Sequence, residues 1–458
     1  MEVEGWLARA AASRPHSTAI ETPTGSWSYE QLDLAARFGA GELSVRGAVA
    51  GARVAIALPA GLEFAQALHA CLLLGAAAVP IDPRLTDGER ERIASGCAVL
   101  VDEPLGEGPA PAGSLRVADG ESHDLDATAV VIHTSGTTSE PRPVELTYGN
   151  VLWSALGSAV ALGSDPRERW LCALPLSHVG GLSILLRSAI YATTAVVHER
   201  FETDLVLHAL REERITLVSL VATTLSRLLD AGLVDPPKLR CALTGGGPVP
   251  AALVRRAQDA GVPVGLTYGL SETCSQVTTT PAAEIHPRGA AGRGGERDDT
   301  TRLTAGPPLF CTRVQINSYE EILVQGPTVA PGAVSPDGWL HTGDLGALDE
   351  RGRLQVTGRR ADTIVSGGEN VAPAEVEAVL EAYPAVMEAA VLGRSDPQWG
   401  EAVTAIVLAR PGEELDVERL RAHCADALAP YKVPKRFELI TEPLPRTRSG
   451  KLLRRELR

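Results

Sequence analysis

The chain of 458 residues is 44% hydrophobic, and it exceeds the ~250–300 residues at which single cores stop growing, so we expect a soluble globular protein with more than one domain. Its net charge of −14 argues against nonspecific attraction to nucleic acid or to an anionic membrane. Seven cysteines are scattered singly, which suits reduced thiols in a cytoplasmic protein and predicts no structural metal.

The N-terminal segment, MEVEGWLARAAASRPHS, has acidic residues before any apolar run and lacks the basic start of a secretory signal. We therefore expect a cytoplasmic location. The most apolar stretch, residues 64–81, contains Gln66 and His69 and reaches Pro80 near its end. A buried helix followed by a strand fits this stretch better than a membrane crossing, so no stable membrane insertion is expected.

Short runs rich in Val, Ile and Leu follow along the chain, at residues 53–59, 129–134, 169–175 and 215–221. They alternate with Ala- and Leu-rich stretches at helical spacing, which is the pattern of parallel strands joined by crossover helices. The first two thirds of the chain are therefore predicted to be α/β.

From about Glu320 the pattern changes to strand-like pieces separated by tight glycine-containing turns, which predicts a smaller β region. Residues 373–386 then read as an amphipathic helix, and two strands and a second helix follow it. The resulting domain prediction is an N-terminal domain over 1–358, a hinge over 359–361 and a C-terminal α+β domain over 362–458.

The segment from His133 to Thr147, HTSGTTSEPRPVELT, joins the end of a predicted strand to hydroxyl residues and a glycine. Exposed amides and hydroxyls of this kind wrap phosphate oxygens. The segment is not a Walker loop, because no GK[ST] follows at the required spacing. Taken alone, the hydroxyl run is equally consistent with an ordinary Ser/Thr turn.

Four further segments occur in order after HTSGTTSEPRP: LTYGLSET at 266–273, GWLHTGD at 338–344, GRRADTIVSGGENVAPAEVE at 358–377 and PRTRSGK at 445–451. Together the five segments resemble the adenylate-forming superfamily of acyl-CoA synthetases, peptide-synthetase adenylation domains and luciferases. The resemblance implies a large α/β N-terminal domain with mixed sheets and a β subregion, and a small mobile α+β C-terminal domain. It also implies activation of a carboxylic acid by ATP and Mg²⁺.

Residues 169–202 and 267–279 resemble, within that superfamily, the o-succinylbenzoate–CoA ligases of menaquinone biosynthesis. This implies o-succinylbenzoate, ATP and CoA as small-molecule partners and o-succinylbenzoyl-CoA as the product. Two alternatives stay open: a ligase for another aryl or medium-chain acid, and a noncatalytic nucleotide- or acyl-binding protein that keeps the fold. Whether the chain is a monomer or a homodimer is also open.

The resemblance assigns the hydroxyl run to the β- and γ-phosphates of ATP, through Thr134, Ser135, Gly136, Thr137 and Thr138. The family usually has Gly, then Pro-Lys-Gly, where this chain has Ser139, Pro141, Arg142 and Pro143. Arg142 keeps the positive charge and is assigned a catalytic role, whereas Ser139 and Pro143 should stiffen the loop.

Glu272 is the expected magnesium ligand and a catalytic residue, since Mg²⁺ takes one or two carboxylates and completes its shell with phosphate oxygens and water. Taken alone, it would be an acid in the first turn of a helix. Thr273 is assigned to the α-phosphate. The remaining nucleotide contacts implied by the resemblance are Gly245, Gly246 and Tyr268 for adenine, and Asp344 and Arg359 for ribose.

Lys451 is assigned as the catalytic lysine that the C-terminal domain brings to the carboxylate and the α-phosphate; taken alone, it would be a solvated charge. Rotation about Arg360 and Ala361 would withdraw it and bring Gly367 and Gly368 to the CoA channel.

For the acyl group, the polar candidates are His178 and Arg187, with Ser275 and Gln276 added by resemblance. o-Succinylbenzoate has two carboxylates, and the one that is not activated needs a counter-charge to be buried. We expect Arg187 to supply it. Taken alone, an arginine on a helix is more often a surface charge.

Overall fold

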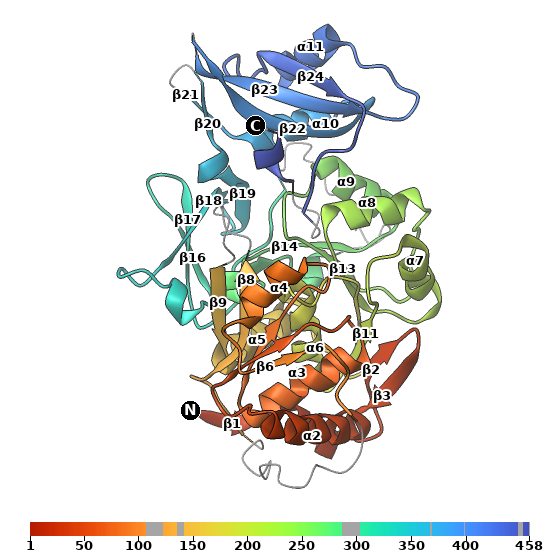
Figure 1. Ribbon diagram of the computed structural model, residues 1–458. Coiled ribbons are helices and arrows are strands. Elements are labelled where there is room, and N and C mark those ends of the chain that lie inside the picture. The colour runs from red at the N-terminus through yellow and green to blue at the C-terminus, as the bar shows by residue number, and fades with distance from the viewer. Residues whose placement is uncertain are drawn as a thin grey trace.

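The computed structural model describes residues 1–106, 122–134, 142–285, 303–366, 369–397, 399–447 and 452–457. These residues form four sheets of four or more strands and a two-stranded ribbon. The C-terminal sheet lies at one end of the molecule and the N-terminal helices lie at the other (Figure 1).

The largest sheet has the strand order β15-β14-β13-β12-β10-β11-β2-β3, and each pair from β14 to β2 is parallel. Its inner strands are short apolar runs buried on both faces, as expected for parallel strands covered by helices. The strands are β2 (Thr18–Thr22), β3 (Gly25–Ser28), β10 (Arg169–Cys172), β11 (Thr194–Val197), β12 (Leu217–Leu220), β13 (Cys241–Thr244), β14 (Val264–Tyr268) and β15 (Thr278–Thr279). The helices that follow them are α6 (Val179–Tyr191), α7 (Thr203–Glu212), α8 (Ala222–Asp230) and α9 (Ala251–Asp259).

A second sheet has the order β6-β4-β5-β8-β9, parallel except for β9. Its strands are β4 (Arg53–Ile56), β5 (Ala77–Pro80), β6 (Val99–Val101), β8 (Thr128–Thr134) and β9 (Arg142–Thr147). The neighbouring elements are α1 (Trp6–Ser13), α2 (Tyr29–Val45), α3 (Leu62–Leu74), α4 (Asp87–Ala94), α5 (Tyr148–Leu162) and the ribbon of β1 (Glu2–Glu4) with β7 (Ser122–Asp124). The largest core combines buried side chains of both sheets with those of α2, α3, α5 and α6.

An antiparallel sheet follows, in the order β16-β17-β18-β19. Its strands are β16 (Arg313–Ile316), β17 (Glu321–Gln325), β18 (Leu340–Leu348) and β19 (Leu354–Arg359). Short 3₁₀ turns also occur in this part of the chain: η2 (Ser271–Thr273), η3 (Ala282–Glu284) and η4 (Pro331–Ala333). This sheet is the β region predicted from the glycine-containing turns.

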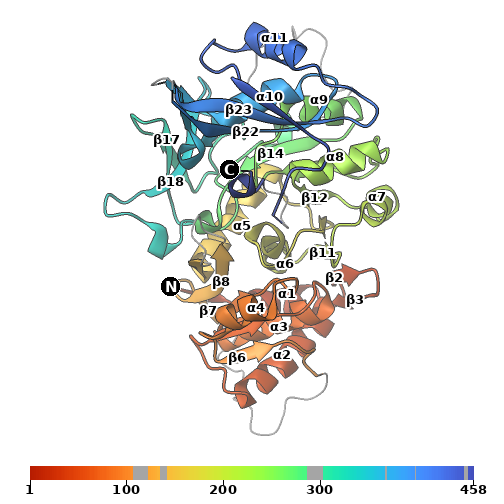
Figure 2. The ribbon, with the colours of Figure 1, turned by 45° about the horizontal axis from the view of Figure 1, so that its top comes forward.

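The turn η5 (Arg360–Asp362) leads into a C-terminal sheet of order β21-β20-β23-β22, in which β24 pairs with β23 on the edge opposite β22. This part has a core of its own, built around α10 and α11. Its elements are β20 (Ile364–Ser366), β21 (Glu369–Val371), α10 (Pro373–Glu381), β22 (Val386–Asp396), β23 (Gly400–Ala409), α11 (Val417–Ala427), β24 (Arg436–Ile440) and η6 (Arg454–Glu456). The C-terminal end of the chain lies on the side of this sheet that faces the rest of the molecule (Figures 1 and 2).

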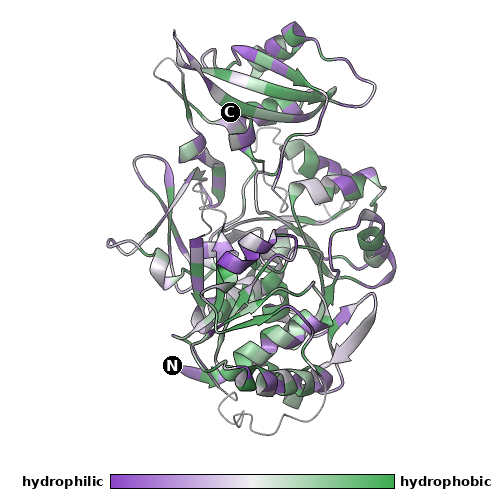
Figure 3. Ribbon diagram, in the orientation of Figure 1, coloured by the Kyte–Doolittle hydropathy of each residue, from purple (hydrophilic) through white to green (hydrophobic). Residues whose placement is uncertain are grey.

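Hydrophobic residues concentrate in the strands and the inner helices, while the outer helices carry hydrophilic ones (Figure 3). Residues 64–81 form α3 and β5, as predicted from the polar residues within that apolar stretch. Among the described helices, none has the length and apolar character needed to cross a membrane.

Candidate active site

The carboxyl ends of β13 and β14 lie side by side, because the strands are parallel neighbours with Thr244 paired to Leu266. A Cβ on Gly245, which follows β13, would come within 2.6 Å of the Thr267 carbonyl oxygen. Gly246 has a φ of +77°, which favours glycine. Close packing therefore explains Gly245 and a positive φ explains Gly246, and the pair lies beside the end of β14, where Tyr268 lies.

Asp344 connects Tyr268 with Arg359. The Tyr268 hydroxyl donates to Asp344 Oδ2 over 2.8 Å, and Arg359 Nε donates to Oδ1 over 2.7 Å. Burial and the charge of Asp344 raise the pKa of Tyr268, so its hydroxyl remains a donor. Because a carboxylate offers about four lone-pair sites, Asp344 can still accept from sugar hydroxyls. Tyr268, predicted for adenine, and the predicted ribose pair thus form one hydrogen-bonded chain.

Glu272 lies in η2, and its backbone carbonyl accepts from Ala330 N over 2.8 Å. Its carboxylate is half-buried and has no hydrogen bond or ion pair within the part of the chain that the structure describes. That part also contains no group of three or more His, Cys, Asp or Glu side chains suited to a metal. A single available carboxylate fits Mg²⁺ held mainly by phosphate oxygens and water.

Thr273 is fully buried, and its hydroxyl is engaged locally. It donates to the Leu270 carbonyl over 3.0 Å and accepts from Leu270 N over 2.9 Å. A hydroxyl has one proton, so donation to the α-phosphate would require the bond to the Leu270 carbonyl to break. This is a constraint on the role predicted for Thr273.

Thr134 and Arg142 pair at the same end of the β8–β9 ladder, and Thr134 Oγ1 donates to the Arg142 carbonyl over 3.3 Å. Arg142 is exposed. The rest of the predicted phosphate cradle lies outside the described residues, namely Ser135, Gly136, Thr137 and Thr138. Its assignment stays a prediction.

Helix α6 carries Arg187 into the interior, where it is only 2% exposed. One guanidinium nitrogen donates to Ser154 Oγ over 3.0 Å, and the group lies 5.6 Å from the centre of the Trp170 ring. No carboxylate among the described residues pairs with it, and its Nε has no hydrogen-bond partner. Burial lowers its pKa. A buried cation without a counter-charge is costly, so this environment suits an anionic ligand.

Ser154 also donates to the Cys274 carbonyl over 2.6 Å, which joins Arg187 to the segment that contains Ser275 and Gln276. Gln276 is buried; its Nε2 donates to Thr279 Oγ1 over 2.9 Å, while its Oε1 has no partner. The structure thus brings three of the four predicted acyl-site residues into one region.

His178, the fourth, is the residue before α6, and its carbonyl accepts from the amides of Gly181 and Leu182. It lies more than two helical turns before Arg187. Its part in the acyl site stays a prediction.

Lys451, Gly367 and Gly368 lie outside the described residues, but residues near Lys451 make contacts within the C-terminal part of the chain. Leu453 N donates to the Pro445 carbonyl over 2.8 Å. Arg454 makes two hydrogen bonds, of 2.6 and 2.7 Å, to the buried carboxylate of Glu377 on α10. The described residues after Lys451 are therefore held by helix α10 and by the segment that contains Pro445.

Arg360 and Ala361, predicted as the hinge, both lie in η5 between β19 and β20. Arg360 is 3.9 Å from the Glu321 carboxylate and 5.8 Å from the centre of the Tyr319 ring. The domain limits 1–358 and 362–458 stay a prediction.

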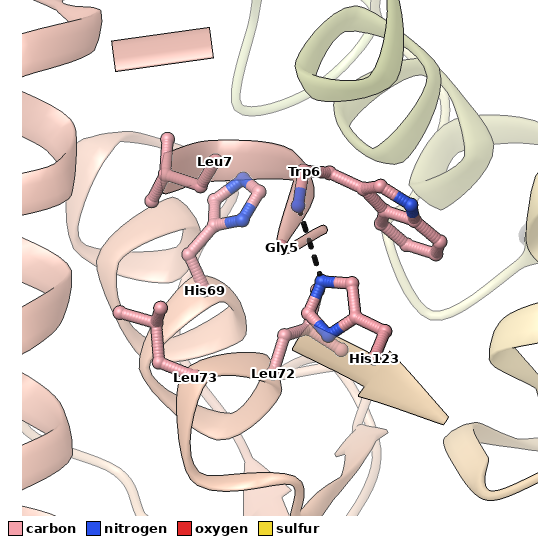
Figure 4. A pocket seen from close by; sticks show the side chains of 7 residues that line it. All are labelled: Gly5, Trp6, Leu7, His69, Leu72, Leu73 and His123. Carbon is pink, nitrogen blue, oxygen red and sulfur yellow. Dashed lines mark hydrogen bonds between the residues drawn. The ribbon is translucent and has the colours of Figure 1, made fainter. Parts of the chain in front are cut away.

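The cavity drawn in Figure 4 is separate from these residues and is lined by Trp6, His69 and His123 with four others. Trp6 N donates to His123 Nε2 over 3.3 Å. Burial lowers the pKa of both histidines to about 4, so they are neutral at pH 7. This cavity contains none of the predicted site residues.

Sequence reasoning missed two residues of the acyl region, Ser154 and Trp170. Both lie in ordinary-looking elements, a serine within helix α5 and a tryptophan within β10. No local motif marks them, because their relation to Arg187 comes from the packing of α5 and α6 and from the position of β10.

Residues 7–333 match the AMP-binding enzyme family, and residues 375–451 match the AMP-binding enzyme C-terminal domain. The chain therefore belongs to the AMP-binding enzymes. Among curated relatives, the 2-succinylbenzoate–CoA ligase of Bacillus licheniformis is 37% identical, with both chains covered in full.

Solved structures of the o-succinylbenzoate CoA synthetase from Bacillus subtilis are similar over all of this chain. The complex with the acyl-adenylate intermediate OSB-AMP has a TM-score of 0.87 at 36% identity, with 98% of that chain covered. The complex with ATP and magnesium ion also has a TM-score of 0.87 at 36% identity, with 100% covered. A double mutant bound to the product analogue OSB-NCoA has a TM-score of 0.70 at 36% identity, with 99% covered.

Proposed function

We propose that this chain activates o-succinylbenzoate with ATP and transfers the acyl group to CoA, as in menaquinone biosynthesis. In the first half-reaction a carboxylate oxygen attacks the α-phosphorus and the bond to pyrophosphate breaks. In the second, the CoA sulfur attacks the acyl carbon, AMP leaves, and the thiol proton passes to solvent. Joining the carboxylate to AMP replaces oxide, a very poor leaving group, with AMP.

The observation that carries the choice of acid is the buried guanidinium of Arg187, which pairs with no carboxylate among the described residues and lies beside the segment that contains Ser275 and Gln276. An acid with a second carboxylate supplies the missing counter-charge, and a charge-assisted pair in a water-poor site is strong. A simple monocarboxylic acid would leave the cation uncompensated. The similarity to 2-succinylbenzoate–CoA ligases over the full chain supports the same substrate.

The geometry of the described residues supports several of the proposed nucleotide roles. Tyr268 and the Gly245 turn offer a flat face and a close backbone approach to adenine, and Asp344 offers acceptors to the ribose hydroxyls. Glu272 would hold Mg²⁺, which neutralises charge on the phosphates. Lys451 would bridge the carboxylate and the α-phosphate as charge shifts between them.

Rotation about Arg360 and Ala361 would then exchange Lys451 for Gly367 and Gly368 near the acyl group. One comparison supports such a rotation: the TM-score falls from 0.87 for the adenylate complex to 0.70 for the product-analogue complex at unchanged identity. A rigid displacement of one domain lowers whole-chain similarity in this way. The arrangement of this chain is thus closer to that of the adenylate complex.

A ligase for another aryl or medium-chain acid would share every nucleotide contact and differ only around Arg187. A noncatalytic binding protein is disfavoured, because Glu272 and Lys451 are both retained. We place the enzyme in the cytoplasm, where ATP and CoA are available, and leave the choice between monomer and homodimer to measurement.

The test is pyrophosphate release by the purified protein with ATP, Mg²⁺ and a panel of carboxylic acids that includes o-succinylbenzoate. We expect release to be fastest with o-succinylbenzoate, and mass spectrometry to detect its AMP anhydride and, after CoA is added, its thioester. Faster turnover of a monocarboxylic acid would contradict the choice of substrate. Failure to form an AMP anhydride with any acid would contradict the proposal as a whole.

A further inference from the structure

Ser154 lies on α5 at 2% exposure, between the acyl-site arginine and the loop that carries Glu272. The start of this helix is fixed, because Asn150 closes a capping box with Thr147 and donates to the carbonyls of Pro327 and Val329. The Ser154 hydroxyl therefore occupies a well-defined position.

The hydroxyl has one proton, and its direction is set by its two partners. A carbonyl only accepts and a guanidinium only donates. Ser154 must therefore donate to the Cys274 carbonyl, over 2.6 Å, and accept from Arg187, over 3.0 Å. Each bond reinforces the other, because donation by a hydroxyl strengthens it as an acceptor.

The Cys274 carbonyl belongs to a turn in an unusual conformation, with a φ of +52° at Cys274 and +95° at Ser275. Neither residue is a glycine, so the surrounding contacts must hold this backbone. The turn folds back onto Gly269, where a Cβ would lie 1.5 Å from the Ser275 carbonyl oxygen. Cys274 follows η2 directly, and η2 contains Glu272.

We infer that Ser154 is a positioning residue that fixes the position of Arg187 relative to the Cys274–Ser275 turn. It acts through them and touches neither nucleotide nor acid. Through Ser154, a carboxylate bound at Arg187 stabilises the same turn that supports Glu272. Ser154 thereby makes adenylation depend on the second carboxylate of the acid. This inference rests on the proposed function, since it assigns the second carboxylate to Arg187.

The experiment measures pyrophosphate release with o-succinylbenzoate and with the analogue that keeps the activated carboxylate and lacks the other one. For Ser154→Ala we expect kcat/KM to fall by about tenfold or more with o-succinylbenzoate, the effect of losing a hydrogen bond to a charged group. With the analogue we expect less than about a threefold fall. Ser154→Thr, which keeps the hydroxyl, should restore the preference for the dicarboxylic acid.

Ser183→Ala is the matched control, because it removes a buried serine hydroxyl that has no hydrogen-bond partner in the part of the chain that the structure describes. It should leave the kcat/KM for each acid unchanged. A double-mutant cycle completes the test: in an Arg187→Ala background, adding Ser154→Ala should change kcat/KM for o-succinylbenzoate by less than about twofold.

Equal losses with both acids, or additive losses in the cycle, would show that Ser154 acts only on general stability and would overturn the inference. If Ser154→Ala does not fold, the comparison of Ser154→Thr with wild type and the specificity of Arg187→Ala decide the question. Loss of the dicarboxylic preference in Ser154→Thr would then count against the inference. Failure of the wild type to activate o-succinylbenzoate would instead contradict the proposed function.

Discussion

Replacing Arg187 with methionine should leave the free energy of unfolding nearly unchanged and strongly reduce the activity. The guanidinium is 2% exposed and has no carboxylate partner among the described residues, so its desolvation costs several kcal/mol. Two contacts offset this cost: the hydrogen bond with Ser154, about 1.5–3 kcal/mol, and the contact with the Trp170 ring, about 2 kcal/mol. Because the opposing contributions nearly cancel, Arg187→Met should change the free energy of unfolding by less than about 1 kcal/mol.

The activity should respond very differently. With Arg187 gone, the second carboxylate of o-succinylbenzoate would be buried without a counter-charge, a loss of about 2–5 kcal/mol. We expect kcat/KM for o-succinylbenzoate to fall by roughly 100-fold, while the KM for ATP changes by less than about twofold. Urea unfolding measures the first quantity, and pyrophosphate release measures the others.

Arg169→Met is a useful comparison, because Arg169 is half-buried and does have a carboxylate partner, at 2.8 Å from Glu21. It should lose stability and leave the kcat/KM for o-succinylbenzoate unchanged. The reasoning about Arg187 would be refuted if Arg187→Met lost more than about 3 kcal/mol of stability and kept its activity. That result would make Arg187 a structural cation.

Three other predictions follow from separate parts of the molecule. Asp344→Asn replaces one of the two carboxylate oxygens, which accept from Tyr268 and Arg359, with an amide nitrogen that only donates. It should raise the KM for ATP by about tenfold and leave the KM for the acid unchanged. Steady-state kinetics with each substrate varied would test this, and a raised KM for the acid alone would contradict it. Lys451→Ala should abolish pyrophosphate release and spare thioester formation from supplied acyl adenylate, so equal loss of both steps would contradict its assigned role. His69 and His123 have pKa values lowered to about 4 in the fold, against about 6.5 when unfolded, so the unfolded chain binds more protons between these values. Stability should therefore fall as the pH drops from about 6.5 toward 4, by up to about 3 kcal/mol per histidine. His69→Leu should make urea unfolding less dependent on pH between 7.5 and 5, and an unchanged slope would contradict this account.

The predicted strands at residues 53–59 and 169–175 are both present, as β4 and β10, but they belong to different sheets. Apolar composition predicts a strand because it reports burial on both faces, and it predicts parallel pairing because crossover helices lie between the strands. It does not report which strands are neighbours. That choice depends on the packing of α2, α3, α5 and α6 between the two sheets, which involves contacts far apart in the sequence.

In the site, too, local motifs predicted individual residues, whereas the contacts between them depend on parts of the chain that lie far apart in the sequence. Ordered motifs predicted Tyr268, Asp344 and Arg359 one by one. The structure pairs Asp344 with Arg359 in the β18–β19 ladder, and it joins Tyr268 on β14 to Asp344 by a side-chain hydrogen bond. The motifs could not predict that Thr273 bonds to Leu270, since this depends on how a three-residue turn closes. Ser154 carries no local signal at all, because its two partners lie 33 and 120 positions away in the chain.

The electrostatics of Arg187 also bear on how the site would reject other acids. A hydrophobic pocket distinguishes related ligands weakly, whereas a site with a buried polar or charged group strongly rejects any ligand that leaves that group unpaired. Binding of a monocarboxylic acid would seal Arg187 from water without neutralising it, so the desolvation already present in the free chain would persist in the complex. A dicarboxylic acid would relieve it. The buried environment that lowers the pKa of Arg187 therefore favours dicarboxylic over monocarboxylic acids. Only an acid with a second carboxylate offsets the unfavourable burial of the cation.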